Sequence, residues 1–228
     1  TVGGAGLPIG KSLTPCVNSH FRQVHDDMTT DTRSRFIEVA RRHFADKGFD
    51  GTSIAAIAAE MGLTKQALLH HFGSKEKLYS EVLQEISVAV TAELGEITAA
   101  TTDPYEALET LLVERIAGEL HESDGTRIVI RELLDNKSRA KSARTWHLKP
   151  YLDGLVAMVK ANPGTAHYTD AQALAAMYQL LGAVNFLVIS EPTLSRMYGQ
   201  RHFREMKRAY PASVRTLVRA IFLGDSRG

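Results

Sequence analysis

The 228-residue sequence predicts an all-α protein, with a small N-terminal domain of three helices and a larger helical C-terminal domain. Apolar residues recur with the 3.6-residue period of amphipathic helices along most of the chain. Residues that favour helix starts, such as Asp103 followed by Pro104, stand between these periodic segments. No stretch shows the sustained two-residue alternation, bounded by hairpin turns, that indicates β-strands.

Composition and charge describe an ordinary globular chain rather than a broadly basic one. Hydrophobic residues make up 44% and charged residues 23%, which is typical of a folded protein. The formal net charge is +1, and residues 29–85 contain eight basic and eight acidic residues. Any contact with nucleic acid therefore has to depend on where charges are placed, because there is no overall excess.

Two features bear on the cellular compartment. Cys16 is the single cysteine, so no internal disulfide can form, which fits a reducing cytoplasm. Residues 171–190 carry no charge over about the length of a membrane span. They include Gln172, Gln179 and Asn185, however, and no basic cluster flanks them. We therefore predict a buried helix, no membrane association and a cytoplasmic location.

The first helix follows a segment, residues 1–28, that we expect to be a flexible tail. This segment is rich in Gly, Pro and short polar residues and has no apolar periodicity. Met28 directly precedes the first helical pattern, so we predict that it is the biological start. If intact-mass measurement showed that the native protein retains Cys16, the predicted start at Met28 would be wrong. Asp31 is predicted to cap the helix and Gly48 to end it.

Residues 52–72 predict two short helices around a glycine turn. Thr52 or Ser53 can cap the first helix, whose apolar positions share one face. Gly62 supplies the turn, because a residue without Cβ adopts positive φ at little cost. Thr64 is predicted to cap the second helix. This arrangement is the helix-turn-helix that places one helix end in the major groove of DNA.

Helical patterns then continue to the C-terminus. Ser74 is predicted to cap a fourth helix. Further patterns run through about 103–116, 126–135, 140–161, 170–190 and 203–222, the last with Pro211 inside it. We therefore divide the helical part of the chain into a helix-turn-helix domain at 29–88 and a larger helical domain at 89–228.

The second helix of the helix-turn-helix has an apolar face and an exposed face. Leu63, Leu68 and Phe72 are predicted to anchor it to the preceding helices. The opposite arc displays Lys65, Gln66, Leu69 and His70. Three short helices with a glycine turn can be only a small core, so the pattern alone leaves DNA binding open. The chemistry of the exposed arc favours it.

This arc carries groups that match DNA chemically. The Thr64 hydroxyl, the Lys65 amine and the free backbone N–H groups of the helix N-terminus can hold a phosphate. Gln66 has the donor and acceptor that pair with adenine in the major groove, and the Ala67 methyl can contact a thymine methyl. Lys75, at the start of the next helix, directs another cation toward the DNA backbone.

The run RFIEVARRHFADKGFDGTSIAAIAAEMGLTKQALLHHFGSKEKLYSEVL resembles the N-terminal DNA-binding domain of the TetR family of bacterial transcriptional regulators. The matching parts, in order, are ARRHFADKGFDGTSI, the turn IA-x-x-x-G-L-T-K, and HHFGSKEKL. The resemblance implies a homodimer whose two recognition helices read the half-sites of a palindromic operator. It also implies a variable helical C-terminal domain that binds a small ligand and dimerises.

Carried over position by position, the resemblance assigns DNA contact to Thr52, Lys65, Gln66, Ala67, His71 and Lys75. One position departs from the family pattern: Leu69 stands where the family usually has a phosphate-contacting tyrosine. Leu69 removes one hydrogen bond. His70 can compensate for it, or Leu69 itself can make an apolar contact with a thymine methyl.

The histidines do not predict a metal site. His70 and His71 are adjacent on a helix, so their side chains diverge by about 100° and cannot easily share one ion. His147 lacks a ligand partner at the i+3 or i+4 spacing. The sequence contains no GxSxG, no HExxH and no phosphate-cradling glycine loop. We therefore expect no catalytic site, no metal and no cofactor.

Aromatic, methionine and polar residues of the C-terminal half can line a ligand cavity, an expectation that rests on analogy with the family. The candidates are Trp146, His147, Tyr151, Met158, Met177, Tyr178, Asn185 and Phe186. Asn185 or His147 would supply the polar contacts. Such residues at helical spacing most often belong to a core, and that alternative stays open for each of them.

The dimer interface is predicted from small residues that permit close helix approach. The uncharged segment 171–190 and the segment 212–222 can form a four-helix seam with a second copy. The candidate residues are Ala171, Ala175, Gly182, Ala183, Val214, Leu217, Val218 and Ile221. If the chain sedimented at micromolar concentration only as a 25.1 kDa species, the predicted dimer would be wrong.

These features together predict a ligand-responsive transcriptional repressor that binds its operator as a homodimer and leaves it when a small-molecule effector binds. Its expected partners are double-stranded DNA, the effector and a second copy of the chain. An activator or a ligand-unresponsive DNA-binding protein remains an alternative. So does a helical carrier or enzyme that does not bind DNA.

Overall fold

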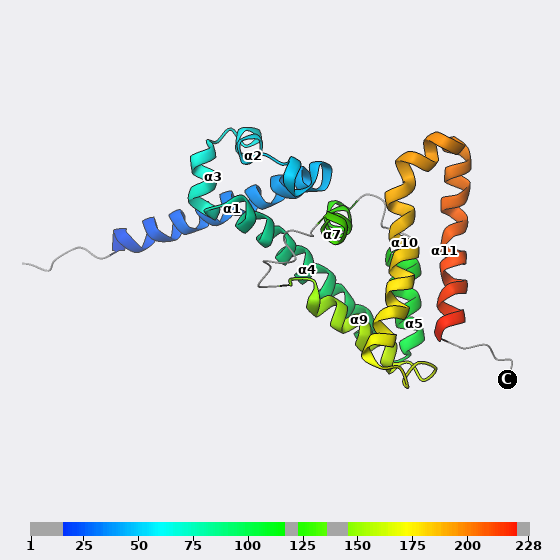
Figure 1. Ribbon diagram of the computed structural model, residues 1–228. Helices are drawn as coiled ribbons and strands as arrows, with labels where there is room; N and C mark the ends of the chain where they lie inside the picture. Colours follow the sequence, from blue (N-terminus) through cyan, green and yellow to red (C-terminus); the bar gives the residue numbers. More distant parts are fainter. Residues whose placement is uncertain (1–15, 117–122, 136–145, 223–228) are drawn as a thin grey trace, which may run out of the picture.

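The computed structural model describes residues 16–116, 123–135 and 146–222, and within these ranges every regular element is helical, as predicted (Figure 1). The helices are α1 (Cys16–Gly51), α2 (Ile54–Glu60), α3 (Lys65–Phe72), α4 (Lys75–Ala100), α5 (Pro104–Glu109), the π-helix η1 (Thr110–Ile116), α7 (Asp124–Asp135), α9 (Lys149–Ala161), α10 (Asp170–Tyr198) and α11 (Gln200–Phe222).

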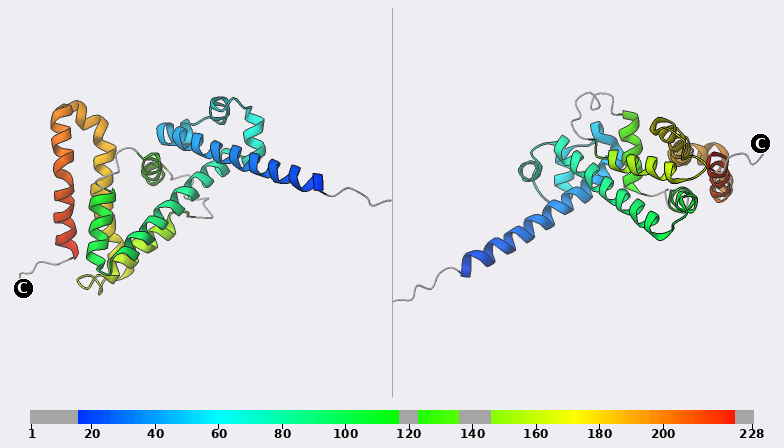
Figure 2. Two further views of the ribbon diagram at one scale, coloured as in Figure 1. Left: turned by 180° about the vertical axis from the view of Figure 1, so that it is seen from behind. Right: turned by 90° about the horizontal axis from the view of Figure 1, so that it is seen from below.

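Helix α4 joins the two parts of the molecule. Its N-terminal end packs with α1 and α3, while its C-terminal part runs beside α9 (Figure 1). On the far side, α10 and α11 form an antiparallel hairpin, which also packs against α5, η1 and α9 (Figures 1 and 2). Helix α7 packs on α1 and thus lies between the N-terminal helices and the hairpin.

The first helix begins earlier than the sequence suggested. Helix α1 starts at Cys16, within the segment expected to be a flexible tail, and residues 1–15 lie outside the described ranges. Asp31 lies inside α1 and cannot be its N-terminal cap. The physical reason is that residues 16–31 contain neither Gly nor Pro, so a helix that is stable from Asp31 onward propagates toward the N-terminus.

The turn between α2 and α3 follows the predicted capping chemistry, whereas neither Thr52 nor Ser53 caps α2 as predicted. Gly48 interrupts α1 with φ 69° and ψ 179°. Gly62 has φ 68°, its N–H donates to the Ala59 carbonyl at 3.0 Å, and the next N–H, of Leu63, donates to the Ala58 carbonyl at 2.9 Å. This pair of bonds is the Schellman ending of a helix, which needs a residue at positive φ. Gly62 therefore sets the angle between α2 and α3.

Side-chain caps begin the next helices as predicted. The Thr64 hydroxyl accepts from the Ala67 N–H at 3.2 Å, and the Ser74 hydroxyl accepts from the Lys77 N–H at 3.2 Å. Asp103 accepts from the Tyr105 N–H at 2.9 Å, ahead of Pro104 in the first turn of α5.

The C-terminal helices differ from the prediction mainly at their ends. Of the helix predicted at 140–161, the structure shows α9 from Lys149, with Pro150 in its first turn, and residues 140–145 lie outside the described ranges. Helix α10 runs past the predicted end at 190 to Tyr198 and contains Pro192. Its two parts meet at an angle of 48° around residue 188. Pro192 has no N–H, so the carbonyl of residue 188 loses its helical hydrogen bond at this point.

Two hydrophobic cores hold the fold together. The N-terminal core is built by α1–α4 around Phe36, Phe44, Ile57 and Leu68, all at most 1% exposed. It also includes Ile128 of α7, which is fully buried. The C-terminal core is built by the later helices and the end of α4, and its centre includes Leu108, Leu112, Leu155, Met177 and Val218. The predicted boundary at residue 88 lies inside the continuous helix α4.

In the described part of the chain, no single helix is long and apolar enough to cross a membrane; by length and composition, only the bent pair Asp170–Leu187 and Ile189–Tyr198 could do so together.

Candidate nucleic-acid interface and internal cavity

Helix α3 exposes the polar arc that the sequence predicted. Leu68 is fully buried and Phe72 is 3% exposed, so this face holds α3 on the N-terminal core. Lys65, Gln66 and His70 are exposed on the other face. Because the Thr64 hydroxyl satisfies only the Ala67 N–H, other N–H groups of the first turn face outward with the positive end of the helix dipole. This combination can hold an anion and present an amide side chain beside it.

Three other predicted positions on or near α3 are less exposed. Ala67 and Leu69 are half-buried at the border between the two faces. The His71 ring packs at 5.5 Å from the Phe36 ring, so it is partly used in the N-terminal core. Leu63 was predicted to anchor the helix, but it is 40% exposed, which corrects that assignment. It follows Gly62 in the turn, which directs its side chain away from the core.

Thr52 is a correction to the predicted set of DNA-contacting residues. Its side chain is 3% exposed, and its hydroxyl lies 2.7 Å from the Gly48 carbonyl and 3.0 Å from the His43 carbonyl. A threonine hydroxyl has one proton to donate, and these acceptors leave it directed into the protein. Thr52 therefore positions the loop before α2 and does not present a hydroxyl to DNA. Ser53 precedes α2 without a side-chain cap.

Lys75 lies where a phosphate contact was predicted, but its amine is turned onto the adjacent loop. The Nζ atom lies 4.5 Å from the centre of the Phe49 ring and donates to the Asp50 carbonyl at 3.4 Å. Both contacts are at the edge of the structure, where a lysine side chain reorients at little cost. The sequence could not have shown this cation–π contact, because Phe49 and Lys75 are far apart in the chain and meet only in the fold.

Ion pairs fasten the N-terminal helices to α4. Arg33 pairs with Glu81, and Arg41 pairs with Glu85 at 2.8 Å, so α1 is tied to α4 at two levels. Helix α2 is tied to α1 through Glu60, which contacts Arg42 at 2.8 Å. These pairs are largely exposed and each contributes little stability, but together they fix the orientation of the helices.

Helix α7 connects α1 to the C-terminal helices. The Arg131 guanidinium donates to the Ala45 carbonyl at 3.1 Å and to the Asp46 carbonyl at 3.0 Å. Arg127 pairs with the Asp46 carboxylate at 3.1 Å on the exposed side. Ile128, between them, is buried in the N-terminal core. These contacts satisfy carbonyls at the end of α1 just before Gly48, where helical hydrogen bonding stops.

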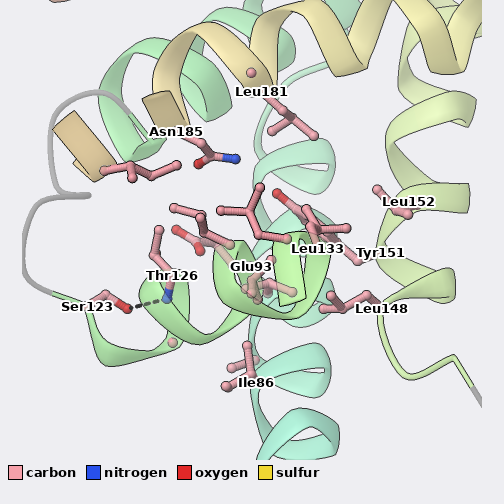
Figure 3. Close-up of a pocket in the computed structure, with 18 of the residues that line it drawn as sticks. Ile86, Glu93, Ser123, Thr126, Leu133, Leu148, Tyr151, Leu152, Leu181 and Asn185 are labelled. Atoms are coloured by element: carbon pink, nitrogen blue, oxygen red, sulfur yellow. Dashed lines mark hydrogen bonds between the residues drawn. The ribbon is translucent and has the colours of Figure 1, made fainter. Parts of the chain in front are cut away.

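The opposite face of α7 borders a cavity of about 550 Å³ between α4, α7, α9 and α10 (Figure 3). Most of its wall is aliphatic or aromatic, including Ile86, Leu133, Leu148, Leu152 and Leu181. A volume of this size matches a drug-sized apolar ligand. Figure 3 shows Tyr151 and Asn185 pointing into the cavity from α9 and α10.

The polar groups of the cavity wall are few and mostly negative or neutral. Arg41 and Glu85 pair with each other at 2.8 Å. The remaining ionisable carboxylate is Glu93 on α4. Burial, together with the nearby Glu93 carboxylate, raises the pKa of Tyr151 to about 12. The Tyr151 hydroxyl is therefore protonated at neutral pH and can donate a hydrogen bond to a ligand.

Four of the eight predicted cavity residues line it, namely Tyr151, Tyr178, Asn185 and Phe186. The other four do not, which corrects the prediction. Met177 is fully buried and Met158 is 4% exposed in the C-terminal core. Trp146 is 48% exposed at the surface, and the His147 ring lies 2.7 Å from the Ser80 hydroxyl.

Sequence reasoning missed the contributions of α4 and α7 to this wall. They supply Ile86, Val90 and Glu93 from α4 and Thr126, Val129 and Leu133 from α7. The available signal was the pattern of α7, in which Ile128 is buried in the N-terminal core while Leu133 lines the cavity. Two apolar faces on one helix indicate that it lies between two packed layers.

The predicted dimer residues fall into two groups. Ala171, Ala175, Gly182 and Leu217 are exposed, and Ala183 and Ile221 are half-exposed. Val214 is 1% exposed and Val218 is fully buried within the chain itself, so these two cannot form an interface, and their assignment is corrected. Along α10 the exposed positions Ala171, Ala175, Tyr178, Gly182, Phe186 and Ile189 follow a spacing of three or four residues and form one continuous apolar face.

In the ranges that the structure describes, no group of three or more His, Cys, Asp or Glu side chains is placed to hold a metal ion.

Comparison with known proteins relates the N-terminal helices to a family of regulators. Residues 36–82 match the family model described as "Bacterial regulatory proteins, tetR family". The chain is 33% identical over 85 residues to the HTH-type transcriptional regulator LmrA of Bacillus subtilis (strain 168), a match of 37% of this chain and 45% of that protein. It is 31% identical over 70 residues to the HTH-type transcriptional repressor AcnR of Corynebacterium efficiens, a match of 31% of this chain and 37% of that protein. The chain thus spans less than half the length of these relatives.

The fold as a whole is similar to a solved structure of a regulator. The transcriptional regulator FadR from Bacillus subtilis, in complex with stearoyl-CoA, superposes with a TM-score of 0.62 at 15% sequence identity. The similarity covers 84% of this chain and 98% of that chain. The structural similarity thus extends over most of this chain, whereas the family model matches residues 36–82 alone.

Proposed function

Since the chain belongs to the tetR family of bacterial regulatory proteins, we propose that it is a transcriptional repressor that binds a palindromic operator as a homodimer and is released by a small-molecule effector. The observation that carries this proposal is the capped N-terminus of α3. It exposes Lys65 and Gln66 beside free backbone N–H groups, while Leu68 and Phe72 fix the helix from behind.

Operator reading depends on two kinds of contact. Lys65 and the first-turn N–H groups hold a phosphate, which sets the depth and angle of α3 in the major groove. Gln66 then reaches a base edge, where its amide pairs with adenine. Ala67, at the border of the exposed face, is close enough to the groove to meet a thymine methyl. His70 lies one turn further along the exposed face.

The second copy of the chain docks on the apolar face of α10, whose Tyr178, Phe186 and Ile189 also line the cavity, so the interface and the cavity share these side chains. Tyr178 is 44%, Phe186 69% and Ile189 44% exposed, and a chain of this size rarely leaves such a row uncovered. Ala171, Ala175 and Gly182 interrupt the row and allow two helices to approach closely. Leu217 extends the row onto α11. Two such faces related by a two-fold axis form a four-helix seam, with Val214 and Val218 inside each chain.

The effector occupies the cavity between α4, α7, α9 and α10. The lining favours an apolar molecule, because most of the wall is aliphatic or aromatic. The Tyr151 hydroxyl and the Asn185 amide supply hydrogen bonds that orient the ligand. A fold neighbour, FadR of Bacillus subtilis, is described in complex with stearoyl-CoA, which supports an apolar ligand for this architecture.

Helix α7 transmits the ligand signal. One face of α7 forms the cavity wall through Val129 and Leu133, and the other holds the end of α1 through Arg131 and Ile128. A ligand that pushes α7 outward therefore shifts α1 and the recognition helix. Half-sites of a palindrome lie about 34–36 Å apart, so a small rotation of each domain misaligns the two copies of α3. Switching requires that the ligand bind the misaligned state more tightly.

Selection of bound sequences from a random pool of duplex DNA tests the proposal. The full chain should enrich a palindrome, and sedimentation should show a species of twice the 25.1 kDa chain mass. The double variant Lys65→Ala/Gln66→Ala, which leaves the buried face of α3 intact, should enrich nothing. A wild-type chain that enriched no sequence would refute operator binding and favour a carrier or enzyme. A palindrome bound upstream of activated genes would favour an activator.

The effector class is tested with alcohols of different chain length. Dodecanol should raise the melting temperature and release the selected duplex, and butanol at the same concentration should do neither. If butanol released DNA as well as dodecanol did, the assigned apolar ligand class would be wrong, although the repressor function would stand.

A further inference from the structure

The end of the hairpin between α10 and α11 concentrates positive charge. Residues 196–208, called here the basic hairpin end, contain Arg196, Arg201, Arg204, Lys207 and Arg208 against one acidic residue, Glu205. This is a net charge of +4 within a chain whose total is +1, so the rest of the chain carries −3. The N-terminus of α11 lies in the same segment, and its helix dipole adds positive potential.

Most of these cations are exposed and have no counter-charge among the described residues. Arg201 pairs with Glu205 at 3.1 Å, and its side chain is still 85% exposed. Arg196, Arg204 and Arg208 are exposed, and no ion pair joins them to another residue of the described ranges. Exposed Met197 and Tyr198 lie beside them in the turn.

The rest of α11 shows that this lack of counter-charge is local. Arg201, Arg204, Arg208, Arg215 and Arg219 recur at spacings that place them along one face of the helix. In the second half of the helix, Arg215 pairs with Glu109, and Arg219 donates to the Tyr105 hydroxyl at 3.2 Å. The face is therefore satisfied where α5 and η1 lie against it, and it is open only where α11 extends beyond them.

The basic hairpin end lies at the same end of the molecule as the DNA-reading helices. In Figure 1 the turn between α10 and α11 is at the top, level with α2 and with the α2–α3 turn that leads to the N-terminus of α3. The view from behind in Figure 2 keeps both at the top. A duplex laid across this end to meet Lys65 and Gln66 continues toward the hairpin.

We propose that the basic hairpin end is a second DNA-contacting surface, which binds duplex phosphates beside the half-site read by α3. The proposal rests on the operator binding proposed above. The contact is electrostatic and carries no base preference, so it adds affinity and salt dependence without changing which palindrome is chosen. The N-terminal domain has as many acidic as basic residues over residues 29–85, eight of each, and so gains most from cations supplied elsewhere.

An anionic membrane surface presents phosphates as well as DNA does. The position of the hairpin favours duplex DNA over a membrane. The basic hairpin end is level with the α3 N-terminus and does not stand alone on a remote face. Its apolar exposed residues, Met197, Tyr198 and Met206, are too few to form the continuous apolar face of a membrane-inserting helix. Duplex DNA is therefore the occupant that the arrangement favours.

The test measures how the affinity for a 40-base-pair duplex carrying the selected palindrome falls as salt rises. Arg204→Gln/Arg208→Gln should lower the slope of log affinity against log salt by roughly 0.9 for each phosphate that an arginine no longer neutralises. Two such phosphates per chain would lower the slope by about 2, or by about 4 for both copies of a dimer. The enriched palindrome should stay the same.

Two controls show whether a change in slope comes from the position of the arginines, and not from the loss of any two cations or from misfolding. Lys149→Gln/Lys160→Gln removes two cations from α9, in the lower half of Figure 1, and should leave the slope unchanged. Arg204→Lys/Arg208→Lys keeps both charges and should retain the wild-type slope. Vesicles of 30% phosphatidylserine in phosphatidylcholine should bind the wild type and the glutamine variant equally weakly.

Each outcome distinguishes this inference from the function on which it rests. A wild-type slope in the glutamine variant overturns the second surface while operator binding stands. If the glutamine variant keeps the wild-type slope, and the wild type binds vesicles whereas the variant does not, the surface contacts a membrane instead. If the wild type binds no duplex, both the inference and the repressor function are overturned.

Discussion

The N-terminal and C-terminal cores are built differently, and the difference fits the functions that we propose for the two halves. The N-terminal core is closed: Phe36, Ile57 and Leu68 are fully buried, so α3 has one orientation. The C-terminal half holds a cavity of about 550 Å³ whose wall includes half-exposed residues such as Leu133. A recognition helix must be rigid to match a groove, whereas a sensor must be able to change shape when its cavity fills.

Helix α7 belongs to both regions, so it links the N-terminal core to the cavity physically. Its Ile128 side chain is fully buried in the N-terminal core, while Leu133, less than two turns later, lines the cavity. A helix held on one side by a closed core and on the other by a cavity wall can pass a movement of the wall to that core. The coupling that we propose between the two sites therefore depends on one helix with two different surroundings.

A matched pair of truncations tests the contrast with the largest expected effect. Leu68→Ala removes a fully buried side chain and should lower the free energy of unfolding by about 3 kcal/mol, with loss of duplex binding. Leu133→Ala removes a side chain that is 49% exposed and should cost less than about 1 kcal/mol. Urea denaturation followed by circular dichroism gives both values. Equal losses would mean that the cavity wall is as tightly packed as the N-terminal core.

The two arginines of α7 provide the next test. Arg131→Ala leaves the Ala45 and Asp46 carbonyls without their charged donor and should cost about 2 kcal/mol. Arg127→Ala removes an exposed pair with Asp46 and should cost less than about 0.5 kcal/mol. Hydrogen exchange should show faster exchange at the end of α1 in the Arg131 variant only. Similar exchange in both variants would remove Arg131 from the coupling path.

What the sequence predicted well depended on chemistry that is local in the chain. Gly62 needs positive φ, and Thr64, Ser74 and Asp103 accept hydrogen bonds from N–H groups two or three residues away, so each cap can be recognised from a few neighbours. The exposed arc of α3 was predictable for a related reason. Polar and apolar residues alternate on this helix with a clear period, which identifies its two faces.

What the sequence could not predict depended on contacts between distant segments. Thr52 is buried because the end of α1 folds over it, and nothing in residues 52–72 indicates that. Helix α10 is apolar almost all round, so its sequence does not separate Met177, which faces the core, from Tyr178, which lines the cavity. Val214 and Val218 were assigned to the dimer face for the same reason. Aliphatic residues on a hairpin suit an internal face and an interface equally.

Base reading provides a third test, confined to the rigid region. Gln66→Ala should lower affinity for the selected palindrome by about 10-fold and relax preference at one base pair per half-site, in keeping with about 1–3 kcal/mol for a bidentate amide contact. Binding to unrelated duplexes should not change. Competition with palindromes substituted at each position gives the measurement. A uniform decrease in affinity on all duplexes would show that Gln66 contacts phosphate and not a base.

Leu69 gives the smallest expected effect and the sharpest question about the rigid region, because it occupies the position where the family usually carries a phosphate-contacting tyrosine. Leu69 is half-buried at the edge of the exposed face, so a longer side chain can extend outward without displacing Leu68. Leu69→Tyr should raise affinity for the palindrome by about 5-fold, since one hydrogen bond to a charged acceptor contributes about 1 kcal/mol. Leu69→Phe, which adds the ring without the hydroxyl, should not. Because a neutral hydroxyl displaces no counterion, the gain should be the same at every salt concentration. If both variants weakened binding equally, the Leu69 side chain would itself touch a thymine methyl, and leucine at this position would change which base the protein reads.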